Sequence, residues 1–291
     1  MQANLLIDSK SSLGEGAIWN QASQELYWID IELGILYLYN PITNTNRSIL
    51  LGQKVGTVVP TTNGTVLVAL QDGIYELHLA TEQKQMLVAR PEPDFPQNRF
   101  NDGKCDAAGR FWVGTLSMLE TAEVAALYVL EKGVIRKKLD KITVSNGIVW
   151  SLDNTKMYYI DSPTRTIKEF DYDIKTGAIK FSRIAVQVPE NLGYPDGMTM
   201  DSEGMLWVAM WEGFCVARWN PNNGELLMRI EVPVLRVTSC AFGGKNLDTL
   251  YITTAKIGAK QEELDKYVHS GSLFVAKTGH QGIPNTYAST K

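Results

Sequence analysis

Four pairs of residues, each beginning with an oxygen-bearing side chain, stand at nearly regular intervals along the chain. These pairs are Glu15-Gly16, Asn101-Asp102, Asn146-Gly147 and Asp196-Gly197. Hard divalent cations such as Ca²⁺, Mg²⁺ and Mn²⁺ prefer carboxylate and amide oxygens, and carboxylate-ligated Zn²⁺ is an alternative. If the fold brings these side chains together, a cation is needed among them, because carboxylates that converge in a narrow space repel each other. The competing interpretation is a set of ordinary turns, for which Asn-Gly and Asp-Gly are common signals.

The segments that follow these pairs repeat one pattern of strand, turn and strand. "EGAIWNQASQELYWID", from Glu15, and "NGIVWSLDNTKMYYID", from Asn146, have the same spacing, while "NDGKCDAAGRFWVGT" and "DGMTMDSEGMLWVAM" match each other with a shorter turn. Weaker copies begin at Gly56 and Ser239. The six starting points are about 45 residues apart, which is the length of a four-stranded propeller blade. The repeats predict an all-β fold, a six-bladed β-propeller that forms a single domain over residues 1–291. The best helical candidate is the short segment 259–270.

In a propeller the innermost strand of each blade lines the central channel, so equivalent positions form a ring at one depth. The leading residues of the six repeats are Glu15, Gly56, Asn101, Asn146, Asp196 and Ser239. We expect the polar members to point inward, and the glycines that follow to let the backbone turn sharply at the channel mouth without a Cβ clash. The common register of four repeats favours a metal site over unrelated turns. Cys105 is expected to point into the packing of its blade.

The overall composition excludes several classes of function. A net charge of −4 gives no electrostatic footprint for nucleic acid or an anionic membrane. No apolar run is long enough for a membrane span, and the first residues show no secretory signal. Three widely spaced cysteines do not suggest a disulfide framework, so we expect a cytoplasmic protein in a reducing compartment. We expect a monomer, as is natural for a closed propeller.

Several segments, in order, resemble the regucalcin/gluconolactonase family of sugar-acid lactonases. They are "LGEGAIW", "RFNDGK" with "GRFWVGT", "SNGIVWS" with "YYIDS", and "YPDGMTMDSEGMLWVA". The resemblance extends from about residue 12 to residue 279 and implies the same six-bladed fold. It also implies metal-dependent hydrolysis of a small-molecule sugar aldonolactone, with Ca²⁺ as the first expected metal and Zn²⁺, Mn²⁺ or Mg²⁺ as alternatives.

The resemblance also assigns residues by position. The metal ligands are Glu15, Asn146 and Asp196, and the substrate-contacting arginine and asparagine are Arg99 and Asn101. The substrate-contacting glutamate of the family falls on Glu120 only if one residue is inserted, because Leu119 occupies the ungapped position.

The implied chemistry is attack of water on a lactone carbonyl, with the metal as Lewis acid. Asp196 is the expected catalytic residue, steering or deprotonating the water, while Arg99 and Asn101 hold the sugar. No Gly-X-Ser-X-Gly elbow is present. Two alternatives stay open: a phosphotriesterase-type hydrolase on the same propeller, and a non-catalytic calcium-binding propeller.

Some polar and aromatic residues fit a structural role better than a chemical one. Asp30 and Asp161 follow aromatic strands and are expected to form turns, with a role in a polar pocket as the alternative. Tyr194 and Trp211 could stack on a sugar face, or pack in the core or at its rim.

Overall fold

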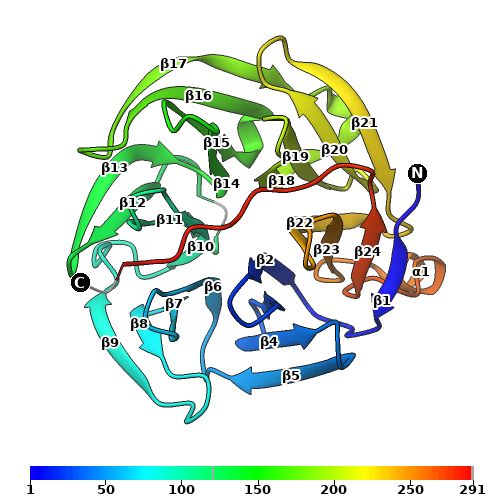
Figure 1. Cartoon of the computed structure of the whole chain (residues 1–291), viewed down its shortest axis with the longest axis horizontal. Coiled ribbons are helices and arrows are strands. Elements are labelled where there is room, and N and C mark those ends of the chain that lie inside the picture. Colours follow the sequence, from blue (N-terminus) through cyan, green and yellow to red (C-terminus); the bar gives the residue numbers. More distant parts are fainter. Residues whose placement is uncertain (120, 290–291) are drawn as a thin grey trace.

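Four antiparallel sheets of four strands each make up most of the first two thirds of the protein (Figure 1). The structure, a computed structural model, describes residues 1–119 and 121–289. The first two sheets are β2 (Gly14–Asn20), β3 (Glu25–Asp30), β4 (Ile35–Asn40) and β5 (Thr45–Leu50), then β6 (Val55–Pro60), β7 (Val66–Leu70), β8 (Gly73–Leu77) and β9 (Lys84–Ala89). The next two are β10 (Asn98–Cys105), β11 (Phe111–Ser117), β12 (Ala125–Glu131) and β13 (Val134–Ile142), then β14 (Ser145–Trp150), β15 (Lys156–Asp161), β16 (Thr166–Asp173) and β17 (Ala178–Gln187).

The remaining strands belong to one eight-stranded sheet. They are β18 (Tyr194–Met200), β19 (Leu206–Trp211), β20 (Cys215–Asn220), β21 (Glu225–Glu231), β22 (Arg236–Gly243), β23 (Thr249–Ala255), β24 (Leu273–Lys277) and the N-terminal β1 (Asn4–Ile7). β1 pairs with β24, so the first strand of the chain completes the last run of strands. The helices are short: η1 (Ser162–Thr164), η2 (Glu190–Leu192) and α1 (Gln261–Lys266).

The innermost strands of these sheets form a closed ring. β2, β6, β10, β14, β18 and β22 contact one another in cyclic order, and β22 returns to β2. The arrangement is consistent with a β-propeller, in agreement with the all-β expectation. Large aromatic side chains such as Trp19, Trp112 and Trp207 are fully buried, and Cys105 is buried in the same core cluster as Phe111, as predicted. Helix α1 lies within the predicted helical segment 259–270. In the described part of the chain, no helix has the length and apolar character to cross a bilayer.

The four conspicuous pairs lie inside the inner strands, each at a β-bulge. The register shifts between Glu15 and Ile18 in β2, and between Phe100 and Gly103 in β10. The same shift occurs at the corresponding positions of β14 and β18. A bulge rotates one side chain out of the regular alternation of a strand. This irregularity explains how polar residues within buried strands face the channel.

The glycines of these pairs differ in their backbone conformation, and two of them leave no room for a Cβ atom. Only Gly16 has a positive φ, of 61°. A Cβ atom on Gly147 would lie 2.6 Å from the Cβ of Met198, and one on Gly197 would lie 2.6 Å from the Oγ of Ser239. At positions 147 and 197 the expected avoidance of a Cβ clash is confirmed: glycine is required because the next inner strand approaches too closely for any side chain, although neither residue has a positive φ.

Asp30 and Asp161 hold the connections that precede the inner strands β2 and β14. Asp30 accepts hydrogen bonds from the backbone N–H groups of Ser12, at 2.7 Å, and Leu33, at 3.2 Å. Asp161 accepts one from the N–H of Val144, at 2.9 Å. Their contacts confirm the structural role.

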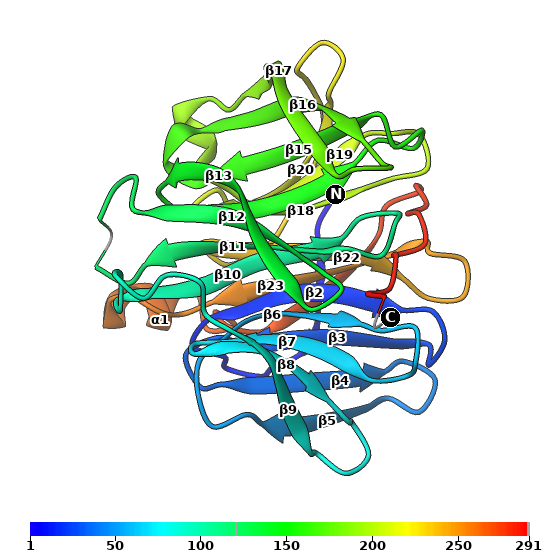
Figure 2. The same cartoon turned by 90° about the vertical axis from the view of Figure 1, so that its left-hand side faces the viewer.

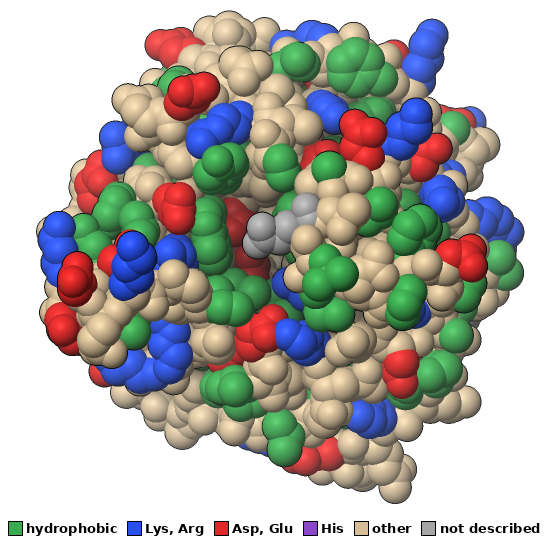
Figure 3. All heavy atoms as spheres, turned by 180° about the vertical axis from the view of Figure 1, so that it is seen from behind, with side chains coloured by type: hydrophobic (Ala, Val, Ile, Leu, Met, Phe, Trp, Pro, Cys, Tyr) green, Lys and Arg blue, Asp and Glu red, His purple; other side chains and the backbone are tan. Residues whose placement is uncertain are grey.

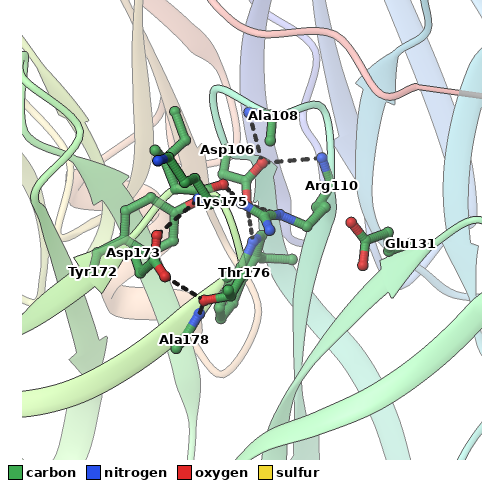
Figure 4. A network of polar contacts seen from close by, with 12 residues as sticks. Asp106, Ala108, Arg110, Glu131, Tyr172, Asp173, Lys175, Thr176 and Ala178 are labelled. Atoms are coloured by element: carbon green, nitrogen blue, oxygen red, sulfur yellow. Dashed lines mark hydrogen bonds and ion pairs between the residues drawn. The ribbon is translucent and has the colours of Figure 1, made fainter.

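A buried polar network joins the sheet of β10 to the sheet of β14 (Figure 4). The Oδ2 atom of Asp106 accepts hydrogen bonds from Arg110 Nε, Trp112 Nε1 and Tyr172 Oη, each at 2.7 Å. Arg110 also donates to the carbonyl of Ile174, at 2.6 Å. Tyr172 lies in β16 of the neighbouring sheet, and Ile174 lies in the turn that follows β16. Asp106 therefore fixes both its own turn and the contact between the two sheets.

Replacing Asp106 with alanine should lower the free energy of unfolding by about 3 kcal/mol, because Arg110 would keep a buried charge without its carboxylate. Chemical denaturation of both proteins measures the difference. Asp153 is a matched control: it also accepts hydrogen bonds in a strand-connecting turn, from Ser151 and Thr155, but it is exposed. Asp153→Ala should lose less than about 1 kcal/mol. Equal losses for the two variants would contradict the role given to Asp106.

The C-terminal segment 278–289 crosses one end of the ring (Figure 1). Its backbone contacts turns from several sheets: Gly282 donates to Leu247 O, Ala288 to Pro60 O and Ser289 to Gly109 O, at 2.8 to 2.9 Å. These turns follow the C-terminal ends of inner strands, whereas the bulged pairs lie nearer the N-terminal ends. The C-terminal segment and helix α1 lie on opposite faces (Figure 2).

Candidate metal and substrate site

Arg99, Asn101 and Asn146 form a hydrogen-bonded chain across two adjacent inner strands. Arg99 Nη1 donates to Asn101 Oδ1 at 2.7 Å and to the carbonyl of Phe100 at 2.9 Å. Asn101 Nδ2 donates to Asn146 Oδ1 at 3.1 Å and to the carbonyl of Ser145 at 2.7 Å. All three predicted site residues are buried. The bulges of β10 and β14 thus turn side chains from two strands toward each other.

The carboxyl groups of Glu15, on β2, and Asp196, on β18, lie close enough to each other for the charge of Glu15 to act on Asp196. Burial, followed by the charge of Asp102, raises the pKa of Glu15 to about 8. Burial and the charge of Glu15 raise the pKa of Asp196 well above its usual range. The backbone N–H of Gly16 donates to Glu15 Oε2 at 2.8 Å and holds that side chain. In the protein alone, the two carboxyl groups therefore favour sharing protons over carrying two charges.

Asp102 and Lys104 add a second pair of charges that the sequence analysis missed. Burial raises the pKa of Asp102 and lowers that of Lys104. The opposite charge of each residue partly offsets the pKa shift of the other. Lys104 Nζ donates to the carbonyl of Met198 at 2.8 Å. One signal was available: Asp102 occupies the place where the other three pairs have glycine.

Ser162 connects Asn146 to the strand that carries Asp196. Asn146 Nδ2 donates to Ser162 Oγ at 2.8 Å, and Ser162 Oγ donates to the carbonyl of Pro195 at 2.7 Å. Ser162 is the last residue of the segment "YYIDS", which contributes to the family resemblance, but that resemblance assigned it no role. This contact fixes the orientation of the Asn146 amide, so that its oxygen Oδ1 is turned toward Asn101 and the channel.

The donor set fits a hard divalent cation. Asp196 Oδ1 is buried and has no hydrogen-bond partner among the described residues, and such an orphaned oxygen is costly unless a cation or proton compensates it. Within the described ranges no cluster of three or more His, Cys, Asp and Glu side chains could hold a metal ion. A cation bound by Glu15 and Asp196 would therefore need an amide oxygen such as that of Asn146, which is the set expected for Ca²⁺ or Mg²⁺.

The pKa of Arg99 falls to about 10 through burial, opposed by the charges of Glu32, Glu15 and Asp196. It therefore stays cationic at neutral pH, beside the two carboxyl groups. Glu120 lies outside the described residues, while the neighbouring Leu119 is exposed. The face that carries α1 is hollowed at its centre, with acidic side-chain surface at the bottom of the hollow (Figure 3).

The two aromatic residues near Asp196 are covered by arginines. The Cζ atom of Arg165 lies 3.8 Å from the centre of the Tyr194 ring, and that of Arg236 lies 5.5 Å from the centre of the Trp211 ring. These contacts favour rim packing over sugar stacking for Tyr194 and Trp211.

Fold and site together define a propeller-like protein whose inner strands carry buried acidic and amide side chains. The profile of the family described as SMP-30/Gluconolactonase/LRE-like region matches residues 13–256, and the chain belongs to this family.

Similar proteins include a putative sugar lactone lactonase, YvrE, of Bacillus subtilis (strain 168), 36% identical over 98% of both chains. Regucalcin of Danio rerio is 37% identical over 98% of this chain and 97% of its own. The solved structure of a luciferin-regenerating enzyme superposes with a TM-score of 0.91 at 32% identity, covering 96% of both chains. A calcium-binding regucalcin from Agrobacterium tumefaciens has a TM-score of 0.93 at 24% identity, covering 99% of this chain and 97% of its own, which supports the fold alone.

Proposed function

We propose that this protein is a metal-dependent lactonase that opens the ester ring of a sugar aldonolactone to give the sugar acid. The observation that carries the proposal is the buried Asp196 Oδ1, which has no hydrogen-bond partner among the described residues and is close enough to Glu15 and Arg99 for their charges to act on it. The lactonase names of the relatives support the reaction class. The acidic site suits a neutral, hydroxyl-rich substrate, because Arg99 and the amides can donate to its oxygens.

We infer that the fold has six blades in a single domain covering residues 1–291. The eight-stranded sheet counts as two blades, because β19 and β22 are paired through the single pair Trp211 and Arg236, and the bridge between Gln2 and Glu231 links the outer edges of the two halves. The cyclic contacts of six inner strands support the same count.

Glu15, Asn146 and Asp196 would hold the metal, with Ca²⁺ as the first candidate and Mg²⁺, Mn²⁺ or Zn²⁺ as alternatives. When bound there, a divalent cation polarises the lactone carbonyl and keeps the carboxylates ionised. Ser162 orients Asn146 through the hydrogen bond at 2.8 Å, so its amide oxygen is held toward the channel.

Asp196 is the general base of the proposed reaction. It accepts a proton from water as the water oxygen bonds to the carbonyl carbon, and it returns the proton to the ring oxygen as the ring C–O bond breaks. Arg99 is held in place by its contacts with Phe100 and Asn101, so its remaining N–H groups meet sugar hydroxyls in a fixed orientation. Asn101 shares this role, and Glu120 is the candidate for a further hydroxyl contact.

A panel of glucono-, galactono- and xylonolactone, followed by acid release in a pH-stat, tests the proposal. Each lactone is assayed with Ca²⁺, Mg²⁺, Mn²⁺ or Zn²⁺ and after chelation, beside an aryl phosphotriester. We expect lactone opening that disappears on chelation. Faster turnover of the phosphotriester would favour the phosphotriesterase alternative. Metal-induced stabilisation without hydrolysis of any compound would favour the non-catalytic calcium-binding alternative.

We also propose a cytoplasmic monomer. The three cysteines are free and buried, which suits a reducing compartment.

A further inference from the structure

Glu92 is a buried carboxylate that lies outside the proposed metal site. It belongs to the connection between β9 and β10, and its side chain is almost inaccessible to solvent. Glu92 Oε1 accepts hydrogen bonds from Thr115 Oγ1 at 2.9 Å and from Tyr128 Oη at 3.0 Å. Glu92 Oε2 accepts one from Asn98 Nδ2 at 3.0 Å. Three neutral donors, on three different strands, thus converge on one carboxylate.

The contacts of Glu92 tie together two connections on the same side of the sheet. Asn98 Nδ2 also donates to the carbonyl of Val124, at 3.0 Å, and Thr115 Oγ1 accepts from the N–H of Ala126, also at 3.0 Å. The N–H of Met118 donates to the carbonyl of Gln97, at 3.0 Å. Glu92 therefore fixes the connection 90–97 and, through Asn98, one end of the connection that joins β11 to β12.

The fixed residue Asn98 directly precedes Arg99. Asn98 pairs with Ser117 and Arg99 pairs with Leu116 in the β10–β11 ladder. Successive side chains of a strand point to opposite faces, so anchoring Asn98 on the side of Glu92 sets the direction in which Arg99 leaves the strand toward Asn101. Burial, followed by the charge of Glu92, raises the pKa of Tyr128, which keeps its hydroxyl a donor.

We propose that Glu92 is a positioning residue for substrate recognition: through Asn98 it holds Arg99 in the arrangement that binds the hydroxyl groups of the lactone. This inference rests on the proposed lactonase function and deepens it. The hydrogen-bond partners of Glu92 among the described residues are Asn98, Thr115 and Tyr128, none of them a proposed metal ligand, so its removal should weaken lactone binding and leave the chemical step intact.

The test is steady-state kinetics of Glu92→Ala and Glu92→Gln, with metal affinity measured separately by the rise in melting temperature on titration with Ca²⁺. We expect Glu92→Ala to raise KM about tenfold, to change kcat less than about twofold and to leave the Ca²⁺ midpoint unchanged. Glu92→Gln should keep KM within about threefold of the wild type, because its amide oxygen can accept from Asn98 while its NH₂ group donates to a hydroxyl.

Asp106→Ala is the matched control. Asp106 is a buried carboxylate of the same sheet, beyond the opposite end of β10, and it also accepts from three side chains. We expect it to lower stability and leave KM unchanged. A general loss of rigidity would instead raise KM equally in Asp106→Ala and Glu92→Ala, and this result would overturn the inference.

Tyr128→Phe removes a single hydrogen-bond donor to Glu92. If Glu92→Ala does not fold, this variant tests the role of Glu92 in its place. We expect KM to rise about threefold with kcat retained. A KM equal to that of the wild type, in Tyr128→Phe or in a folded Glu92→Ala, would overturn the role of Glu92. The lactonase proposal would still stand in that case, because the wild-type protein would still hydrolyse the lactone. Absence of lactone turnover in the wild-type protein would overturn both.

Discussion

Asp196→Asn should remove lactone turnover, lowering kcat by about a thousandfold or more at saturating metal. Asparagine keeps the size of the side chain but can neither accept the proton of the attacking water nor supply the negative charge that faces Glu15. The oxygen concerned, Asp196 Oδ1, is buried and unpartnered among the described residues, so no nearby group replaces it. Initial rates of acid release measure the effect.

Asp201→Asn is a suitable control for that experiment. Asp201 follows the same inner strand and is equally buried, but its carboxylate accepts from Trp207 Nε1 and Arg218 Nε, each at 2.8 Å, in a turn. Below its unfolding temperature this variant should keep the wild-type kcat. Turnover by metal-saturated Asp196→Asn at the wild-type rate would rule out Asp196 as the base.

The second large effect concerns stability without metal. The metal-free protein should lose stability as the pH rises from about 5 to about 8, while the metal-saturated protein should not. The pKa of Glu15 is raised to about 8 in the folded protein, so the folded state binds a proton that the unfolded state has already released. Stability is therefore greatest below the unfolded pKa and falls as the pH passes through the folded pKa. A cation at a thousand times its Kd would add about 4 kcal/mol.

Melting temperatures between pH 5 and pH 8, with excess Ca²⁺ and with chelator, measure this dependence. Glu15→Gln provides the control, because it removes one of the buried charges. This variant should be more stable than the wild type without metal at pH 8, and should gain little from Ca²⁺. A melting temperature of the metal-free wild type that stays constant across the range would contradict the account of Glu15 and Asp196.

The convergence of the candidate site could be predicted because it depends on register. Glu15, Asn101, Asn146 and Asp196 occupy equivalent positions of similar repeats, and equivalent positions of a ring meet at its centre. The reason for the glycines was harder to predict. The sequence marks positions 147 and 197 as special, but glycine occurs both where φ is positive and where two strands approach each other closely. Only the distance to Met198 or Ser239 distinguishes these two reasons.

Residues outside the repeated pattern could not be predicted. Ser162 reaches Asn146 from a short 3₁₀ turn, and Glu92 reaches Asn98 from an irregular connection. Neither segment has a periodicity that fixes its place in space. The involvement of Asp102 could have been predicted from the sequence. It occupies the position at which the other three pairs have glycine, and a charged residue at such a position must have room for its side chain. Its neighbour Lys104, two residues further along the strand, follows from the alternation of side chains.

The C-terminal segment also has a practical consequence. It lies across the end of the ring at which the inner strands finish, held by hydrogen bonds such as that from Ala288 to Pro60 at 2.8 Å. A sugar ester would then enter, and its acid product leave, through the opposite face, and accumulating acid should compete with fresh ester because both bind at the same site. The face crossed by the C-terminal segment is therefore the one through which the protein can be attached to a bead or electrode, because the opposite face, through which substrate would enter, then points into the solution.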